Sequence, residues 1–369
     1  MINAFHILFC RCLAVIFLCM LASCAAPPST TMAPRPVVTP WTTVDVFYGT
    51  NRKATGEVGP NHVFGTQLGD LRYGVCQVTI TATHAPGEIE RPEWYKFEFS
   101  EDPVKHVTIR TLRHLSRDEF ATLFSVARQE MNTEDILIFI HGFSNTFDES
   151  VRRTGQLCYD LGFPGIAMTY SWPSQGAFSV ANYYRDEDYV RQSIPYLKQF
   201  LLDVVRNADG ARINIIAHSM GNRLMTRTIA EIEKEAPQAV FNQIILAAPD
   251  VDAKVFKEDI FPRMAGKARH FTLYASSDDK ALMASRVLHD QSRLGESGEF
   301  LTIVPGLDTI DSTGVDPSTL GHSYYSSTRT LLNDIHDLMI ESVPPEKRYL
   351  RHVPGQPAAY WQMVFDSDE

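Results

Sequence analysis

The sequence has no excess of basic residues. Lysine and arginine together number 34 against 44 aspartates and glutamates, and the formal net charge is −10. The acidic residues are scattered along the chain, and nothing in the pattern indicates a basic surface of the kind that binds phosphate backbones. The composition therefore argues against nucleic acid as a partner.

Cysteine is scarce, and the common metal-binding patterns are missing. The chain has six cysteines, and neither a CxxC pair nor an HExxH motif occurs. We therefore expect no metal site and no cofactor. Beyond residue 24 only Cys76 and Cys158 remain. The sequence leaves open whether they form a disulfide.

The N-terminal region lacks an apolar run long enough for a comfortable membrane span. Residues 12–22 are apolar, follow the single charge of Arg11 and are typical of an export signal. The run ends in Leu21-Ala22-Ser23-Cys24, which resembles the bacterial lipobox, whose cysteine carries a diacylglycerol. We expect residues 1–23 to be a lipoprotein signal peptide and Cys24 to be lipidated. The alternatives are an ordinary signal peptide cut slightly later and a retained anchor helix.

The predicted location follows from this N-terminal region. Two acyl chains hold a protein stably on a membrane, where one would not. Ala25, which is not acidic, resembles the outer-membrane sorting pattern of Gram-negative lipoproteins, so we expect a lipid-anchored protein of the cell envelope on the periplasmic side of the outer membrane. Residues 24–41 are rich in proline, threonine and alanine, which predicts a flexible tether.

The next segment, residues 42–116, has the pattern of strands separated by turns. Strand-like runs occur at Val44–Tyr48, Tyr73–Ile80 and Val107–Ile109, with glycine, proline and asparagine between them. We expect a β-rich N-terminal extension that packs on the main domain.

From residue 117 the pattern changes to apolar, β-branched runs that alternate with helical stretches, which is typical of a parallel sheet covered by helices. The predicted strands are Ile136–Ile140, Gly165–Tyr170, Ile213–Ala217, Gln243–Ala248, His270–Ala275 and Phe300–Val304. The predicted helices are Phe147–Leu161, Ala181–Asn207, Asn222–Glu235, Lys254–Met264, Ala281–His289 and Tyr324–Ser342. We therefore expect a doubly wound, mostly parallel α/β core over residues 117–345, with ligands at the carboxyl ends of its strands. Residues 346–369 are expected to be a C-terminal tail.

The third apolar run leads into the motif that carries the chemistry. Ala217-His218-Ser219-Met220-Gly221 is a variant of the G-x-S-x-G nucleophile elbow, with alanine in the first position. The elbow is a tight strand-to-helix turn that lifts the serine above the sheet and points the first N–H groups of the helix at a developing oxyanion. We expect Ser219 to be a nucleophile. The alternative is a serine that only caps the helix.

A serine nucleophile needs a base, and the base needs an orienting carboxylate. In an α/β-hydrolase fold these follow in the order serine, acid, histidine. His322, between the last predicted strand and the last predicted helix, is the expected base. The other downstream histidines, expected to be structural or surface residues, are His270, His289, His336 and His352. For the acid, two residues compete after the run that ends at Ala275, and two more follow the preceding strand as a fallback: Asp278 and Asp279, then Asp250 and Asp252.

The oxyanion hole needs a donor besides the N–H of Met220, normally from the loop after an earlier strand. Gly142 permits a turn there that would present the N–H of Phe143. His141 is interpreted as a loop-shaping residue, because the base comes late in the chain of this fold. Four aromatic residues are candidates for an apolar acyl pocket, namely Phe147, Trp172, Tyr183 and Tyr184.

Several short segments of this chain match those of a known family, in the same order and with the same surroundings. They are Phe47-Tyr48-Gly49-Thr50-Asn51-Arg52, Tyr73-Gly74, Ile140-His141-Gly142-Phe143, Tyr170-Ser171-Trp172-Pro173-Ser174, Ala217-His218-Ser219-Met220-Gly221-Asn222, Tyr274-Ala275-Ser276-Ser277-Asp278-Asp279 and Gly321-His322-Ser323-Tyr324. On these residues the chain, from Val44 to Ser342, resembles a bacterial family of α/β-hydrolases of unknown function (DUF900). The resemblance implies the α/β-hydrolase fold and an esterase-like activity, without a substrate. Its Ser-Ser-x-Asp pattern favours Asp279 over Asp278 as the acid.

The leading hypothesis is a serine hydrolase with the triad Ser219, His322 and Asp279. It would cleave small-molecule or lipid-like carboxylic esters with short or medium acyl groups through an acyl-enzyme. An acyltransferase or an amidase or peptidase could use the same triad. A non-catalytic envelope lipoprotein that uses the scaffold for binding is a third class, because fold does not imply function.

Overall fold

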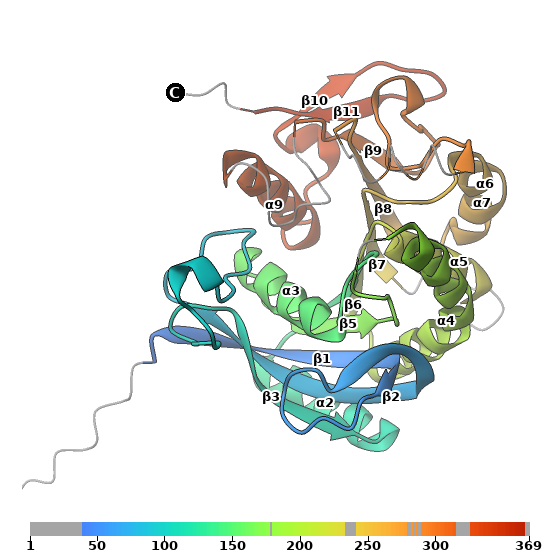
Figure 1. The fold of residues 1–369 in the computed structure, drawn as a ribbon. Coiled ribbons are helices and arrows are strands. Elements are labelled where there is room, and N and C mark those ends of the chain that lie inside the picture. Colours follow the sequence, from blue (N-terminus) through green and yellow to red (C-terminus); the bar gives the residue numbers. More distant parts are fainter. Residues whose placement is uncertain are drawn as a thin grey trace, which may run out of the picture. The chain divides into compact units, whose positions relative to one another are not determined.

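Eleven strands form one sheet in the part of the chain that the structure describes (Figure 1). The computed structural model describes residues 39–177, 179–232, 241–278, 282, 285, 289–314 and 325–365, except the side chains of 325–328. Residues from Pro40 onward form one compact unit. The strands are β1 (Trp41–Ala54), β2 (Phe64–Thr81), β3 (Thr108–Leu115), β4 (Asp135–Ile140), β5 (Ile166–Ser171), β6 (Arg212–His218), β7 (Phe241–Ala247), β8 (Ala268–Ala275), β9 (Asp308–Asp311), β10 (Leu350–Val353) and β11 (Tyr360–Met363).

The strand order is β10-β11-β9-β8-β7-β6-β4-β5-β1-β2-β3. Strands β4 to β9 are parallel, as the alternation of apolar runs and helices predicted. The chain passes from β4 to β5 on one side and then to β6 on the other. The carboxyl ends of β4 and β6 therefore lie beside a point where the strand order reverses, which is where ligands bind in doubly wound sheets.

The N-terminal strands continue this sheet. β1 pairs in parallel with β5, with Val46 opposite Ala167, and β2 and β3 follow it as antiparallel neighbours. The expected β-rich segment is present, but it joins the sheet edge to edge and does not pack on it as a separate layer. The physical reason is that β5 would otherwise be an edge strand with an unpaired row of backbone groups.

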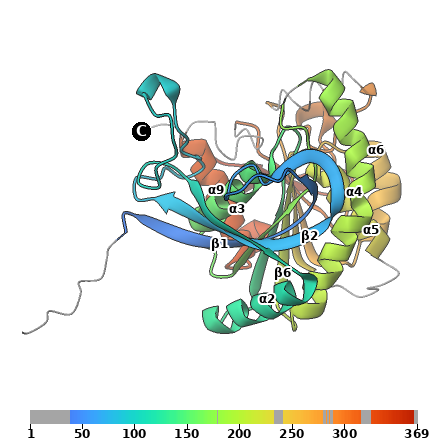
Figure 2. The ribbon, with the colours of Figure 1, turned by 60° about the horizontal axis from the view of Figure 1, so that its bottom comes forward.

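Helices cover both faces of the sheet (Figures 1 and 2). One face carries α2 (Arg117–Met131), α4 (Val180–Asn207), α5 (Gly221–Glu231), and a run of α6 (Ala253–Val255), the π-helical η3 (Phe256–Ile260) and α7 (Phe261–Met264). The other face carries α3 (Phe147–Asp160) and α9 (Tyr325–Met339). Short 3-10 turns are η1 (Trp94–Lys96), η4 (Gly298–Phe300) and η6 (Pro345–Lys347). Capping boxes, in which serine or threonine pairs with glutamate, begin α2 and α3.

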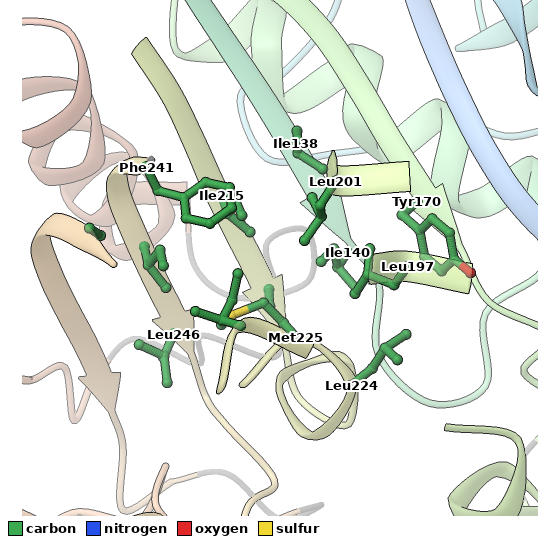
Figure 3. Packing of buried hydrophobic residues seen from close by; sticks show 14 of the residues in the cluster. Ile138, Ile140, Tyr170, Leu197, Leu201, Ile215, Leu224, Met225, Phe241 and Leu246 are labelled. Carbon is green, nitrogen blue, oxygen red and sulfur yellow. The ribbon is translucent and has the colours of Figure 1, made fainter. Parts of the chain in front are cut away.

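Side chains alternate along the buried strands between two apolar clusters. On β4, Ile138 and Ile140 belong to the cluster under α4 and α5, whereas Leu137 and Phe139 belong to the cluster under α3 and α9. Figure 3 shows part of the first cluster, where side chains of both helices pack on the strands: Leu197, Leu201, Leu224 and Met225 over Ile138, Ile140 and Ile215. Burial of this apolar surface, at about 25 cal/mol per Å², is the main stabilising contribution to the fold.

One strand lies elsewhere than expected. The apolar run Phe300–Val304 is not a strand. The strand that pairs with β8 on the side away from β7 is β9, Asp308–Asp311, with Thr272 opposite Asp308. The earlier run is irregular, with Val304 buried against the core. The apolar side chains of residues 300–304 favour a strand there. A short strand near the edge of a sheet needs few apolar side chains, however, and its position is decided by backbone pairing.

The segment expected to be a C-terminal tail contributes two strands to the sheet. β10 and β11 pair with each other, and β11 pairs in parallel with β9. Before them, the buried side chain of Arg348 donates a hydrogen bond to Asp334 of α9 at 3.0 Å. These contacts tie residues 348–363 to the main fold.

The cysteines Cys76, on β2, and Cys158, on α3, are both buried free thiols. No helix among the described residues is both long enough and apolar enough to cross a membrane. Three predicted functional residues, Cys24, Asp279 and His322, lie outside the described residues.

Candidate active site

Ser219 lies in the tight turn between β6 and α5, as the elbow motif predicted. Its φ is +48°, a left-handed value that is uncommon for a residue other than glycine. Such strain persists only where the surroundings impose it, and it is typical of nucleophile elbows. The side chain is half-buried. No described residue forms a hydrogen bond with its hydroxyl, so here the serine does not act as a helix cap.

Close backbone packing explains the glycines around the elbow. A Cβ on Gly221 would lie 2.4 Å from the carbonyl oxygen of His141, and a Cβ on Gly142 would lie 2.9 Å from the Cβ of Ser219. Neither position has room for a side chain. The loop after β4, predicted to supply the second oxyanion donor, therefore lies directly against the elbow.

The side chain of Asn222 fixes the backbone of the elbow. It is fully buried, and its side-chain amide donates to the carbonyl oxygens of Ala217 at 2.9 Å and Ser219 at 3.2 Å. The N–H of Ser219 donates to Ala247 of β7 at 3.0 Å. Sequence reasoning included Asn222 in the family motif but gave it no role, and its position after the elbow was the available signal.

The backbone N–H of Met220 has no hydrogen-bond acceptor among the described residues. It stands at the start of α5, where the helix dipole favours negative charge. This is the property that an oxyanion donor requires. Across from it, the side chain of Asn145 donates to the carbonyl oxygens of Phe143 at 2.9 Å and Gly142 at 3.4 Å, which braces the β4 loop from within.

A buried arginine clamps the β4 loop from outside. The fully buried Arg52, on β1, donates from Nη2 to the carbonyl oxygen of Asn145 at 2.7 Å and from Nη1 to that of Ser174 at 3.0 Å. Its Nε donates to the Ser171 hydroxyl at 2.9 Å. One side chain thus joins the loop after β4 to the loop after β5. The motif Phe47-Tyr48-Gly49-Thr50-Asn51-Arg52 was the sequence signal, but its role was not predicted.

His141 is held in the neutral form by this arrangement. Burial and the adjacent Arg52 guanidinium hold the pKa of His141 well below its usual range. Its Nδ1 donates to the carbonyl oxygen of Gly142 at 2.8 Å, so Nε2 accepts from Arg52. The ring stacks on Trp172 at 5.1 Å. These contacts are those of a loop-shaping residue, as expected.

The counter-charge of Arg52 is Asp186, on α4. Burial raises the pKa of this carboxyl to about 6, against hydrogen bonds that lower it. The Ser174 hydroxyl donates to it at 2.5 Å and the N–H of Gln175 at 3.0 Å. The β5 loop is therefore held at Ser174 both by Arg52 and by Asp186.

The fallback acids already have partners. Asp250 is buried beside the elbow, and its carboxylate accepts from the hydroxyls of Tyr183 and Ser285, both at 2.6 Å, and from Arg223 at 3.0 Å. Asp252 accepts from the N–H of Val255 and caps α6. With these three donors on its carboxylate, Asp250 has little capacity left to orient a catalytic histidine.

The loop after β8 carries the preferred acids, of which Asp278 is described and exposed. Its Oδ2 accepts from the N–H of Gly314 at 2.9 Å, and Ser312 donates to the carbonyl oxygen of Ala275 at 2.7 Å. The loops after β8 and β9 are thus tied together. In sequence, His322 follows Gly314 by eight residues. The assignments of Asp279 and His322 stay predictions.

The other downstream histidines have structural or surface positions. His289 contacts Glu187 at 2.8 Å and the carbonyl oxygen of Ser285 at 2.8 Å. His336 of α9 donates to the carbonyl oxygen of Leu161 at 2.8 Å. His270 and His352 are exposed on β8 and β10. None of the four forms a hydrogen bond with Ser219 in the described structure.

The four aromatic candidates for an acyl pocket lie in different environments. Phe147 is fully buried between Tyr48 and Phe64, and Trp172 is fully buried against His141, so both have the position of core residues. Tyr183 is nearly buried, with its hydroxyl on Asp250. Tyr184 is half exposed. Among the four, Tyr183 has its ring beside Phe143, the predicted oxyanion donor, with 5.5 Å between the ring centroids.

Comparison with solved structures finds several hydrolases of low similarity. A predicted CIB-like hydrolase from Thermoplasma acidophilum is similar at 13% identity and a TM-score of 0.36, over 81% of this chain and 98% of its own. Carboxyl esterase 2 from Tuber melanosporum is similar at 11% identity and a TM-score of 0.36, over 89% and 98%. An alpha-beta serine hydrolase homologue from Coxiella burnetii is similar at 14% identity and a TM-score of 0.32, over 73% and 93%. No curated protein matches the chain.

The family match covers the strands, helices and loops that build the elbow. Residues 116–339, more than half of the chain, match the family model described as alpha/beta hydrolase of unknown function (DUF900). The chain therefore belongs to the DUF900 family of α/β hydrolases.

Proposed function

We propose that the protein hydrolyses carboxylic esters with Ser219 as the nucleophile. The strained backbone of Ser219 carries the proposal, because it lifts a serine above the sheet beside a Met220 N–H that no described residue accepts from. A serine with only a structural role needs neither a strained backbone nor a neighbouring N–H group without an acceptor among the described residues.

The reaction would proceed through an acyl-enzyme. The Ser219 oxygen attacks the ester carbonyl, His322 takes its proton, and Asp279 orients the imidazole. The amides of Met220 and Phe143 stabilise the oxyanion. The proton passes from His322 to the leaving alcohol, and a water deprotonated by the same histidine then releases the acyl group. We propose a short or medium acyl group.

Labelling with a fluorophosphonate tests the nucleophile. Ser219→Ala should abolish covalent labelling and p-nitrophenyl ester turnover with little change in melting temperature, since this serine caps no helix among the described residues. A matched control is Ser116→Ala, which removes a serine that does cap a helix. This control should lose about 1 kcal/mol of stability and keep full labelling.

Two further variants test the proposed partners. Asp279→Asn should give slow labelling, because the serine remains but is poorly activated, while Asp278→Asn should behave as the wild type. His322→Ala should abolish turnover. Wild-type protein that neither labels nor hydrolyses any ester of a broad panel would contradict the proposal and favour a scaffold that only binds. Products formed with competing alcohols or amines would reveal acyl transfer.

We also propose that the protein is held on the periplasmic side of the outer membrane by lipid on Cys24. The lipobox-like Leu21-Ala22-Ser23-Cys24 directly after the apolar run supports this proposal.

A further inference from the structure

Four large aromatic side chains project from one short turn. In the segment Trp94–Phe99, here called the aromatic tip, the exposed fractions are 78% for Trp94, 59% for Tyr95, 84% for Phe97 and 81% for Phe99. Single exposed apolar residues are common, but a contiguous exposed apolar patch marks a surface that contacts another molecule or a membrane. None of these residues belongs to the candidate active site.

The turn that presents these rings is well ordered by its own contacts. The N–H of Lys96 donates to the carbonyl oxygen of Glu93 at 2.8 Å, and that of Phe97 donates to Trp94 at 3.1 Å. Phe97 has a left-handed backbone with a φ of +58° at the end of η1, and its side chain is exposed there. The exposure is therefore imposed by a defined backbone.

Ion pairs fix the base of the loop that carries the aromatic tip. The buried His84 contacts Glu90 at 2.9 Å and Asp160 of α3 at 2.8 Å, and Arg152 of α3 contacts Glu101 at 2.6 Å. A braced base loses little further entropy when the tip binds a partner.

The base of this loop lies where the chain first enters the fold. The N–H of Ala82 donates to the carbonyl oxygen of Pro40 at 3.1 Å, and the Thr81 hydroxyl donates to that of Val104 at 2.6 Å. Figures 1 and 2 both show the loop on the same side of the unit as the start of β1. The chain from Cys24 to Pro40 would reach at most about 58 Å when fully extended. A lipid on Cys24 would therefore keep this side of the fold within reach of the bilayer.

We propose that the aromatic tip inserts into the lipid–water interface of the membrane. Tryptophan and tyrosine prefer the headgroup level, where an apolar ring and a polar atom are both satisfied, and the phenylalanine rings would lie among the acyl chains. A stable protein interface involves about 20–30 residues on each side, many more than this six-residue turn. This proposal is independent of the hydrolase activity.

The charges around the tip add a specific expectation. Glu93 pairs with Lys96, and Lys105 pairs with Glu98 at 3.4 Å. Residues 88–105 contain six acidic residues against three lysines and arginines, so this loop has no excess of positive charge. Attraction to anionic lipids needs an excess of basic residues. Insertion should therefore depend on the apolar rings and be no stronger in phosphatidylglycerol vesicles than in phosphatidylcholine vesicles.

The test is quenching of Trp94 fluorescence by lipids brominated near the glycerol end of their acyl chains. The full-length lipoprotein is reconstituted into phosphatidylcholine vesicles, and the difference between wild type and Trp94→Phe isolates the signal of Trp94. We expect strong quenching by the brominated lipid and little by aqueous iodide. The double variant Phe97→Ser, Phe99→Ser should lower the lipid quenching severalfold without changing the melting temperature or ester turnover.

A matched control moves the probe to another exposed aromatic position. Tyr349 is 63% exposed and lies just before β10. In the Trp94→Phe background, a Tyr349→Trp probe should be quenched by iodide and not by brominated lipid. If Trp94 is itself quenched by iodide and not by brominated lipid, the membrane proposal is overturned, and the tip is left as a surface for a protein partner.

Discussion

At the scale of single residues, the environment of Arg52 has the clearest consequence for catalysis. This side chain makes no contact with Ser219, yet it joins the backbone of the β4 loop at Asn145 to that of the β5 loop at Ser174. The positions of the proposed oxyanion donors must be accurate, because a displacement of a catalytic group by about 1 Å can lower the reaction rate roughly a hundredfold. We interpret Arg52 as a positioning residue for the proposed reaction.

Replacing Arg52 tests that interpretation. Arg52→Lys keeps the charge beside Asp186 but has no planar fork to join both loops, so we expect kcat for p-nitrophenyl esters to fall by roughly tenfold or more with a smaller change in KM. Arg52→Met should lower stability by about 1–3 kcal/mol or more, because the buried carbonyl oxygens of Asn145 and Ser174 lose their donor. Arg191→Met, at a 66% exposed side chain, is the control and should change neither quantity. Wild-type kcat in Arg52→Lys would show that the clamp is not needed.

At the scale of elements, the loop between β2 and β3 depends on the charge state of His84. Burial acts to lower the pKa of His84, but hydrogen bonds to Asp160 and Glu90 prevail and raise it to about 9. A group whose pKa is higher in the folded state stabilises the fold fully below its unfolded pKa and loses that contribution as pH rises through the folded value. The loss should therefore occur between about pH 6.5 and 9.

We accordingly expect the melting temperature to fall by about 2 °C or more across this pH range. A loss of about 1 kcal/mol in the free energy of unfolding lowers the melting temperature of a large domain by that amount. His84→Gln should melt lower at neutral pH and show a weaker fall, because its side chain cannot carry the charge. The control is His352→Gln, at an exposed histidine on β10, which should follow the wild-type curve. Identical pH profiles for His84→Gln and wild type, followed by calorimetry, would contradict this account of the loop.

Among the elements, the sequence predicted best where a local pattern decides the structure. Helices α3, α4 and α9 and strands β4 to β8 lie close to their predicted positions, because apolar spacing and capping residues are local properties. The strand expected at Phe300–Val304 was wrong because pairing with β8 selects the more polar segment Asp308–Asp311. Pairing partners far apart in the chain leave no local pattern to detect.

At the scale of the whole molecule, the proposed anchor and the aromatic tip concern how the protein meets the membrane. The chain enters the fold at Pro40, whose carbonyl oxygen binds the N–H of Ala82 at the base of the loop that carries the tip. A lipid at Cys24 and aromatic rings at 94–99 would be two membrane attachments of the same protein. Two signals hold a protein on a membrane more stably than one.

Cys24→Ser tests the anchor. Without the thiol no thioether to diacylglycerol can form, so we expect the variant to remain unprocessed and to take up no radioactive fatty acid. Cys76→Ser, at a buried thiol inside the fold, is the matched control and should be labelled as the wild type is. Equal labelling of Cys24→Ser and the wild type would remove the lipid anchor from this account.

The sequence by itself determined the alternating strands and helices, the elbow around Ser219 and the family to which the chain belongs. These properties depend on residues that are neighbours along the chain or that form recognisable short motifs. Only the tertiary structure decided that β1 to β3 extend the sheet, that Arg52 clamps two loops that follow it by 93 and 122 residues in the chain, and that Asp250 is already engaged by Tyr183 and Ser285. The reason is physical: backbone pairing and buried hydrogen bonds join groups separated by many residues, and their partners become known only when the chain has folded.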